Sequence, residues 1–250
     1  MQDSDWEIEK KFWQSHGYNL LKTEDQSPSL QSTRSEASES MHHRGGAFTE
    51  TQLIYGEPLR QTLNQKGRRV LSVGLGLGYN EILVAYEALK NKISPFEFQL
   101  LSFESENFLS ESFLDWCSSR SSASIYNEIF HFFSGTQSGR PEIANSEVRT
   151  WLRNAFESGH WKLEKALTAD QFFLQSYDCI FYDAFSSKTS PQLWEQEFLT
   201  KFLQKAASKN CQFTTYACTG GLKRALKAAG FEVILREGFQ SKRNSTLGLR

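Results

Sequence analysis

Residues 68–90, "RRVLSVGLGLGYNEILVAYEALK", decide the fold. They begin with a short β-branched run, pass through three glycines, and end in apolar residues at helical spacing. A strand that leads through a glycine-rich turn into a helix lets the backbone approach a ligand closely and points free helix N–H groups at it. The stretch therefore predicts a nucleotide-type site at Gly74, Gly76 and Gly78.

The alternation of strand and helix continues to the end of the chain. Further strands are predicted in "FEFQLLSFES", "HWKLEKAL", "YDCIFYDAF", "CQFTTYA", "FEVILREG" and "STLGLR", the last two as an antiparallel pair. The helices between them are predicted in "ENFLSESFLDWCSS", "SIYNEIFHFF", "SEVRTWLRNAFESG", "PQLWEQEFLTKFLQKAAS" and "TGGLKRALKAAG". This order predicts a mostly parallel seven-stranded sheet with helices on both faces.

We divide the chain into an N-terminal extension, residues 1–65, and a Rossmann-like domain, residues 66–250. The extension begins with an amphipathic segment, and its polar stretch from Thr23 to Ser40 is expected to be a mobile loop or one ordered by a ligand. The following "FTETQLIYGEPLRQTLNQ" is expected to be a helix or a helix pair interrupted near Gly56 and Pro58.

Composition excludes several classes of protein. The 250 residues are 39% hydrophobic, lack an export signal at the N-terminus and contain no apolar run that could span a membrane, so we expect a cytoplasmic protein without membrane contact. The four cysteines form no CxxC pair, which argues against structural zinc and a disulfide framework. The net charge is −1, but residues 188–250 carry +7, which is compatible with a polyanionic partner.

The spacing of the glycine loop favours one cofactor over another. GxGxG followed by Asn80 fits S-adenosylmethionine (AdoMet) methyltransferases better than the GxGxxG of nicotinamide enzymes. Glu104 follows the second strand of the alternating region, where a carboxylate can accept both hydroxyls of a ribose. Asp170, in "ALTADQFF", is expected to open a helix, as an N-cap or as a contact to the adenine amino group.

Asp183 and Phe185 follow the most hydrophobic strand, "YDCIFYD". In a parallel sheet this places them beside the glycine loop, near the reactive end of the cofactor. An acid beside an aromatic ring suits a methyltransferase that acts on an amine or a base, because aromatic faces stack on bases and attract cations. The neighbouring His42 and His43 point apart in regular structure and have no third ligand nearby, so a metal site is not predicted.

Several separate motifs resemble one enzyme family. "YDCIFYDAFSSKTSPQLWEQEF", "FTTYACTGGLKRALKAAGFEV", "GFQSKRNSTLG" and "ESMHHRGGAFTETQLIYG" are similar to the methyltransferase domain of MnmC-type tRNA wobble-uridine methyltransferases, over roughly residues 20–250. The resemblance implies the class I AdoMet-dependent methyltransferase fold and N-methylation of 5-aminomethyl-2-thiouridine in tRNA. It implies the stand-alone methyltransferase form, with a separate flavin- or GTP-dependent tRNA-modifying enzyme acting upstream.

The resemblance also implies residue roles. The glycines, Asn80 and Glu104 correspond to the cofactor site, Asp170 to its adenine side, and Glu50 to the signature that borders the cofactor. Asp183 corresponds to the acid at the reacting amine, with Phe185 beside it. The substrate side is assigned to Lys188, Lys242 and Arg243. Two positions depart from the family pattern: Ser187 replaces a proline, and "SKRNSTL" lacks a glycine before its Lys-Arg pair.

Several readings remain open from the sequence. Asp183 either removes a proton from the amine or only orients its N–H groups. The alternatives to a tRNA methyltransferase are an AdoMet-dependent enzyme for another amine or RNA substrate, a nicotinamide-dependent oxidoreductase, and a catalytically silent RNA-binding protein.

Overall fold

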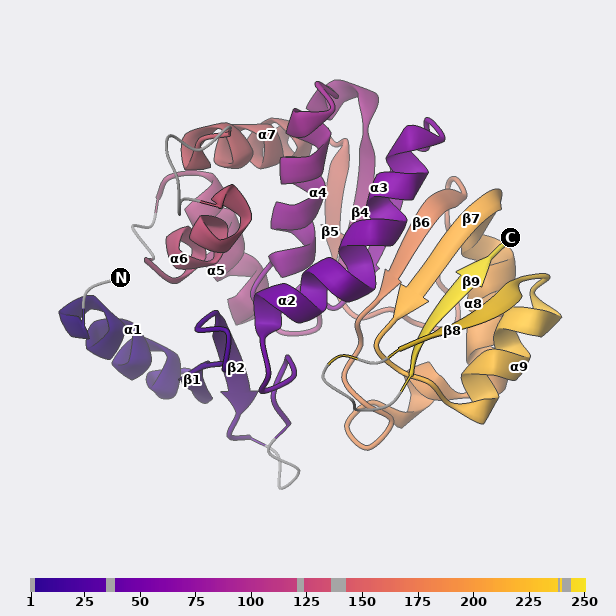
Figure 1. Cartoon of the computed structure of the whole chain (residues 1–250), viewed down its shortest axis with the longest axis horizontal. Helices are drawn as coiled ribbons and strands as arrows, with labels where there is room; N and C mark the ends of the chain where they lie inside the picture. Colours follow the sequence, from indigo (N-terminus) through magenta and orange to yellow (C-terminus); the bar gives the residue numbers. More distant parts are fainter. Residues whose placement is uncertain (1–2, 35–38, 121–123, 136–142, 238, 240–243) are drawn as a thin grey trace.

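A seven-stranded sheet forms the centre of the molecule (Figure 1), in a computed structural model that describes residues 3–34, 39–120, 124–135, 143–237, 239 and 244–250. In spatial order its strands are β5 (Trp161–Glu164), β4 (Gln99–Phe103), β3 (Arg69–Val73), β6 (Tyr177–Tyr182), β7 (Ala207–Thr215), β9 (Ser245–Leu249) and β8 (Glu232–Arg236). Strand β9 runs antiparallel to both of its neighbours, and the remaining pairs are parallel. The predicted mostly parallel sheet with an antiparallel C-terminal pair is confirmed.

Helices cover both faces of this sheet, as predicted (Figure 1). One face is packed by α3 (Glu57–Asn64), α4 (Tyr79–Lys90), α5 (Asn107–Cys117), α6 (Ser124–Ser134) and α7 (Asn145–Glu157), and the other by α8 (Gln196–Ala206) and α9 (Gly220–Ala228). In β3, Val70 joins the first cluster whereas Leu71 and Val73 join the second. This division follows from the alternation of side chains along a strand. None of the helices in the described residues is long and apolar enough to cross a membrane.

The N-terminal extension shares the core of the main domain. It contains α1 (Asp3–Ser15), the antiparallel hairpin of β1 (Tyr18–Lys22) and β2 (Pro28–Ser32), and α2 (Ala47–Thr51). Trp13, Tyr18 and Leu30 are buried in the same cluster as α4, and the Trp13 ring lies edge-on to that of Tyr126 on α6. The extension therefore has no separate core within the described residues, and its boundary at residue 65 stays a prediction.

Part of the polar stretch from Thr23 to Ser40 is regular structure, since it contains β2. The carboxylate of Asp25 organises the turn before β2 by accepting hydrogen bonds from the hydroxyls of Thr23, Ser27 and Thr49. The low apolar content of this stretch predicts a mobile loop, but hydrogen bonds to Asp25 order the turn instead. Residues 35–38 lie outside the described residues.

The expected helix pair is present, but the interruption near Gly56 and Pro58 is a change of helix type and not a break in the helix. Helix α2 continues through the π-helical turn η1 (Gln52–Gly56) into α3, and Gly56 has helical angles of φ −66° and ψ −47°. Pro58 is tolerated because it lies in the first turn of α3. The π turn also lets the carbonyl of Ile54 accept a hydrogen bond from the Thr214 hydroxyl at 2.6 Å. Such turns are frequent at functional sites.

Two further expectations are corrected. The helix predicted to open at Asp170 is absent, because the few residues between Asp170 and β6 leave no room for two helical turns. The helix predicted to open at Pro191 is two elements, the 3₁₀ turn η3 (Pro191–Trp194) and α8, separated by the extended Glu195 at ψ 135°. A second 3₁₀ turn, η2 (Pro95–Glu97), precedes β4.

Candidate active site

A cavity of about 340 Å³ lies at the carboxyl ends of β3, β4 and β6. The order of strands in the sheet reverses between β3 and β6, and ligands of open α/β sheets bind at this switch point (Figure 1). The volume falls within the range of small-molecule sites, about 300–1,000 Å³. Residues 39–43, here called the strap, close one side of the cavity from the N-terminal extension.

The sheet and the extension contribute lining residues from most of the predicted motifs. The lining comprises the strap, Glu50, Val73–Gly76, Tyr79, Asn80, Phe103–Ser105, Ala166, Leu167, Asp183–Phe185, Ser190, Gln192, Leu193 and Tyr216. The structure thus brings together Glu50, Gly74, Gly76, Asn80 and Glu104 with the two predicted catalytic residues.

The glycines of the loop differ in what surrounds them. Gly76 lines the cavity at φ 52°, and an added Cβ would lie 3.3 Å from Met41 Sδ of the strap. Gly78 lies outside the cavity lining, at φ 71°, and an added Cβ would lie 2.2 Å from the ring of Phe113 on α5. Helix packing therefore accounts for the glycine at position 78, and its assignment to the cofactor stays a prediction.

Glu104 is held by the glycine loop. Its Oε2 accepts the backbone N–H of Gly76 at 2.9 Å, and its Oε1 accepts that of Glu106 at 2.9 Å. Burial raises the pKa of Glu104, against the opposing effect of these two N–H donors. Each oxygen retains a lone pair for a further donor, so the carboxylate is oriented toward the cavity without being saturated.

Asp183 sits at the end of β6 against the first turn of α4. Asn80 Nδ2 donates to Asp183 Oδ2 at 3.1 Å, while the buried Asn80 Oδ1 has no hydrogen-bond partner among the described residues. Burial raises the pKa of Asp183 to about 6, and the side chains of Tyr55 and Asn80 oppose that rise. The Tyr55 hydroxyl is itself buried and has no well-formed hydrogen bond within the described part of the chain. These unsatisfied polar atoms point to a polar ligand.

Glu50 is a second carboxyl in the same cavity. It lies on α2, and its Oε2 accepts the backbone N–H of His43 at 2.7 Å. Burial raises the pKa of Glu50 to about 7, and the negative charge of Asp183 adds to the rise. No lysine or arginine of the described residues forms an ion pair with either acid.

Aromatic residues fix the backbone that follows β6. The Trp194 indole N–H donates to the carbonyl of Phe185 at 2.6 Å, and the Tyr216 hydroxyl donates to that of Ala184 at 2.9 Å. Trp194 is 8% exposed, so it is a packing residue, whereas the half-buried Phe185 lines the cavity.

Glu39 anchors the strap to this loop and was not predicted as a site residue. Its carboxylate accepts hydrogen bonds from the backbone N–H of Ser186 at 3.0 Å, from the Ser186 hydroxyl at 3.1 Å and from the Thr189 hydroxyl at 2.5 Å. Because Glu39 lies about 150 residues before Ser186 and Thr189, no local sequence pattern predicts these hydrogen bonds. At the other end of the strap, the His43 ring lies edge-on to that of Phe239, with centroids 5.6 Å apart.

Other predicted residues lie away from the cavity. Asp170 is exposed in a turn near Lys201 and does not line the cavity, where Ala166 and Leu167 occupy that side. The structure therefore does not bring Asp170 to the predicted adenine side. Lys188 is exposed on the loop after β6 and is not a lining residue. Lys242 and Arg243 lie outside the described residues.

The cavity is acidic. Its described lining includes four carboxylic acids, Glu39, Glu50, Glu104 and Asp183, and no lysine or arginine. This arrangement suits a ligand that carries a sulfonium or an ammonium charge and opposes the pyrophosphate of a nicotinamide dinucleotide. The acidic lining, Glu104, and the unsatisfied Asn80 amide oxygen fit AdoMet.

The described residues contain no cluster that could hold a metal ion. The half-buried His42 ring lies edge-on to the ring of Tyr79, and desolvation lowers the pKa of its imidazole to about 4.

Comparison with known proteins identifies the chemistry. Residues 136–250 match a family model described as S-adenosyl-L-methionine-dependent methyltransferase. The chain is 35% identical over 72 residues to the tRNA 5-methylaminomethyl-2-thiouridine biosynthesis bifunctional protein MnmC of Pseudoalteromonas atlantica, an alignment that covers 29% of this chain and 10% of that protein. It is 27% identical to the MnmC of a Marinomonas species over 72% of this chain and 26% of that protein.

Two matches extend over nearly all of the chain. An uncharacterized protein of Methanocaldococcus jannaschii, MJ0670, is 27% identical over 92% of this chain and 59% of that protein. The crystal structure of MNMC2 from Aquifex aeolicus superposes with a TM-score of 0.65 and 19% identity, over 100% of this chain and 78% of that one, and shows the fold. These matches to curated relatives span between 10% and 59% of the relatives' own length.

The predicted class I methyltransferase fold is thus confirmed, as is AdoMet as the cofactor. The nicotinamide oxidoreductase is no longer an alternative. The chain is an S-adenosyl-L-methionine-dependent methyltransferase that is similar in sequence to part of the MnmC proteins and in fold to MNMC2.

Proposed function

We propose that the protein methylates the amino group of 5-aminomethyl-(2-thio)uridine at the wobble position of tRNA, giving 5-methylaminomethyl-2-thiouridine. The names of the MnmC relatives support this assignment. The observation that carries it is the acidic cavity, which is lined both by Asp183, held by the Asn80 amide, and by Phe185. A primary amine on a pyrimidine ring matches a carboxylate next to an aromatic face.

The residues act on the amine and its base. When bound, AdoMet supplies the methyl group as an electrophile on a positively charged sulfur. Asp183 accepts an N–H of the amine, which directs the nitrogen lone pair and stabilises the positive charge that develops on nitrogen during attack. Phe185 offers a face on which the uracil ring stacks. Partial burial of the site opposes the charged ammonium form and so eases loss of the proton that leaves the nucleophilic neutral amine.

Recognition of the rest of the tRNA is assigned to residues outside the cavity. No lysine or arginine lines the cavity in the described part of the chain, so basic residues outside that lining are assigned to the phosphates. We assign this role to the basic segment from residue 188 onward, with Lys188, Lys242 and Arg243 as substrate contacts. The substrate already carries an aminomethyl group, so a separate tRNA-modifying enzyme, flavin- or GTP-dependent, acts first.

Mass spectrometry of nucleosides tests the proposal. Transfer RNA that carries 5-aminomethyl-2-thiouridine is incubated with the protein, with and without AdoMet, and digested. We expect the aminomethyl nucleoside to be converted to the methylaminomethyl form only when both protein and AdoMet are present. If the nucleosides of the tRNA are unchanged and the same preparation methylates a small amine, the substrate is not RNA and the proposal is wrong.

A further inference from the structure

The cavity contains one more carboxyl than the mechanism above uses. Glu104 is held by the backbone N–H groups of Gly76 and Glu106, and Glu39 by the hydroxyls of Ser186 and Thr189. Among the described residues, Glu50 accepts a single hydrogen bond, from the backbone N–H of His43, and it lines the same cavity as Asp183. In this described surrounding the two carboxyls share a cavity without a basic partner, which leaves a negative potential that a cationic ligand would neutralise.

The substrate amine provides such a cation. A free alkyl amine resembles lysine, with a pKa of about 10.4, and therefore arrives as an ammonium ion near neutral pH. An ammonium has no lone pair, so one proton must leave before nitrogen can attack. One carboxylate can hold the remaining N–H groups, but a second group is needed to receive the proton.

We propose, on the basis of the proposed function, that Glu50 is this second group: Glu50 and Asp183 bind the substrate as an ammonium ion, and Glu50 accepts the proton whose loss exposes the nitrogen lone pair. The N–H bond breaks and an O–H bond forms on Glu50. The electron pair left on nitrogen then forms the bond to the methyl carbon, the carbon–sulfur bond breaks with its pair going to sulfur, and the product leaves as a secondary ammonium ion. Solvent at the cavity mouth takes the proton from Glu50.

The surroundings of the two acids divide these roles. Asp183 is fixed by Asn80 and lies against Tyr55, which suits an orienting group. Glu50 lies on a helix that lines the cavity, and burial together with Asp183 raises its pKa to about 7, which suits a proton acceptor near neutral pH. The titratable groups that face Glu50 or share its cavity are Asp183 from β6, Tyr55 from η1, Tyr216 after β7, and Glu39, His42 and His43 from the strap.

The sign of the pH dependence follows from the raised pKa. Below about pH 7 Glu50 is mostly protonated and cannot accept a proton, so turnover falls. Above that pH the carboxylate is available and turnover reaches a plateau. The glutamine of Glu50→Gln cannot ionise, so this variant should lose the fall in turnover below about pH 7, here called the acidic limb of the pH profile. Glu50→Asp should retain the acidic limb.

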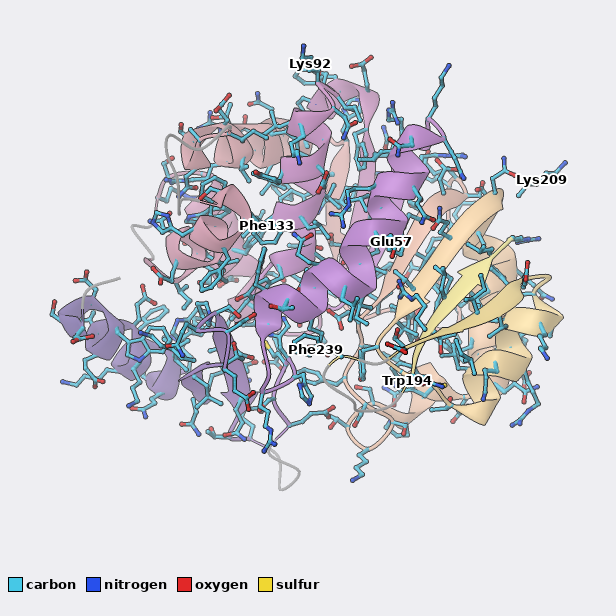
Figure 2. All side chains as sticks on the ribbon, in the orientation of Figure 1. Glu57, Lys92, Phe133, Trp194, Lys209 and Phe239 are labelled. Atoms are coloured by element: carbon cyan, nitrogen blue, oxygen red, sulfur yellow. The ribbon has the colours of Figure 1, made fainter. Side chains whose placement is uncertain are left out.

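The experiment compares pH profiles of kcat/KM for 5-aminomethyl-2-thiouridine tRNA between pH 5.5 and 9, in the unaltered protein, Glu50→Gln, Glu50→Asp and Glu50→Ala. Glu57→Gln is the matched control, because Glu57 is exposed on α3 and outside the cavity (Figure 2). Calorimetric titration with AdoMet is run on each protein. We expect Glu50→Gln to lose at least tenfold in kcat/KM and the limb near pH 7, while its AdoMet affinity stays within about threefold and Glu50→Asp regains the limb.

Two outcomes would overturn the role of Glu50. One is an unchanged pH limb in an active Glu50→Gln. The other is a loss of AdoMet affinity that accounts for the whole loss of turnover, which would make Glu50 a ligand of the cofactor. Absence of any tRNA methylation by the unaltered protein at every pH is a separate result, which contradicts the proposed function and this inference with it.

Discussion

Asn80 Nδ2 donates to Asp183 Oδ2 at 3.1 Å, and this hydrogen bond ties the first turn of α4 to the end of β6. The contact crosses the switch point of the sheet, so it fixes the proposed catalytic acid relative to the glycine loop. It also lowers the pKa of Asp183, in opposition to burial.

Removal of this donor is the first test. Asn80→Ala should raise the pKa of Asp183 above its value of about 6 and shift the corresponding limb of the kcat/KM profile to higher pH. A hydrogen bond to a charged group contributes about 1.5–3 kcal/mol, so turnover at pH 7 should fall roughly 10- to 100-fold. Asn91→Ala is the control, since Asn91 bonds the Glu87 carbonyl at the other end of α4. Equal effects of the two variants would indicate loss of the helix alone.

Asp183→Asn separates catalysis from cofactor binding. The amide keeps the size of the side chain and can still meet Asn80, but it carries no charge to stabilise the developing ammonium. We expect kcat to fall by at least about 100-fold while AdoMet affinity changes little, as measured by single-turnover methylation and calorimetry. A parallel loss of AdoMet affinity and turnover would assign Asp183 to the cofactor.

The sequence predicts the fold and the central part of this site because both depend on local patterns. The succession of a strand, glycines and a helix predicts the loop at residues 74–78. The position of Glu104 and Asp183 directly after predicted strands places both acids at the same edge of the sheet. Glu39 escapes such reasoning, because its partners Ser186 and Thr189 meet it only after the strap folds back. The helix predicted at Asp170 failed for a different reason. Asp170 is a suitable N-cap residue, but the connection from Asp170 to β6 is too short to contain a helix.

Ser187 occupies the position at which the sequence resemblance leads us to expect proline. The hydrogen bonding of the surrounding backbone shows that proline would fit there. Thr189 N–H donates to the Ser186 carbonyl at 3.0 Å, which closes a turn with Ser187 at its second position, where proline is favoured. Ser187→Pro should therefore stabilise the protein by about 0.4–1 kcal/mol without loss of activity. Thermal unfolding checks the first expectation and kcat/KM the second.

The same turn depends on Glu39. Glu39→Ala removes the acceptor of three hydrogen bonds, so the KM for tRNA should rise. Adding Ser187→Pro should restore part of that loss. A destabilised Ser187→Pro protein, or a double variant no better than Glu39→Ala, would contradict this account of the loop.

Two glycines of the loop should fail in different ways. In Gly78→Ala the new methyl would meet the Phe113 ring, and the positive φ adds strain, so unfolding should become easier by roughly 2–4 kcal/mol. In Gly76→Ala the nearest atom is the flexible Met41 sulfur, and the methyl would enter the cavity. Its main effect should be on AdoMet affinity, measured by calorimetry. The reverse ranking of stability losses would show that the loop, and not α5, restricts position 78.

Acidity of the cavity gives a prediction that needs no substrate. Glu50 and Asp183, with pKa values of about 7 and 6, are mostly ionised at pH 8 and mostly protonated at pH 5.5. A bound sulfonium favours the ionised forms, so it lowers both pKa values, and AdoMet affinity must rise as pH increases through this range. If the pKa of one carboxyl falls by half a unit on binding, the Kd changes by about threefold between the two limits, which agrees with the small losses of AdoMet affinity expected for Glu50→Gln and Asp183→Asn.

S-adenosylhomocysteine is the matched ligand for this measurement. It lacks the sulfonium charge but has the same amino acid and adenosine groups, so titration of the ligand's own amino group affects both compounds alike. We expect its Kd to change much less than that of AdoMet between pH 5.5 and 8, and we expect AdoMet binding near pH 6.5 to release protons. Calorimetry in buffers of different ionisation enthalpy measures both quantities. Equal pH dependence for the two ligands would mean that neither carboxyl interacts with the sulfonium, and the acidic lining would then serve the substrate alone.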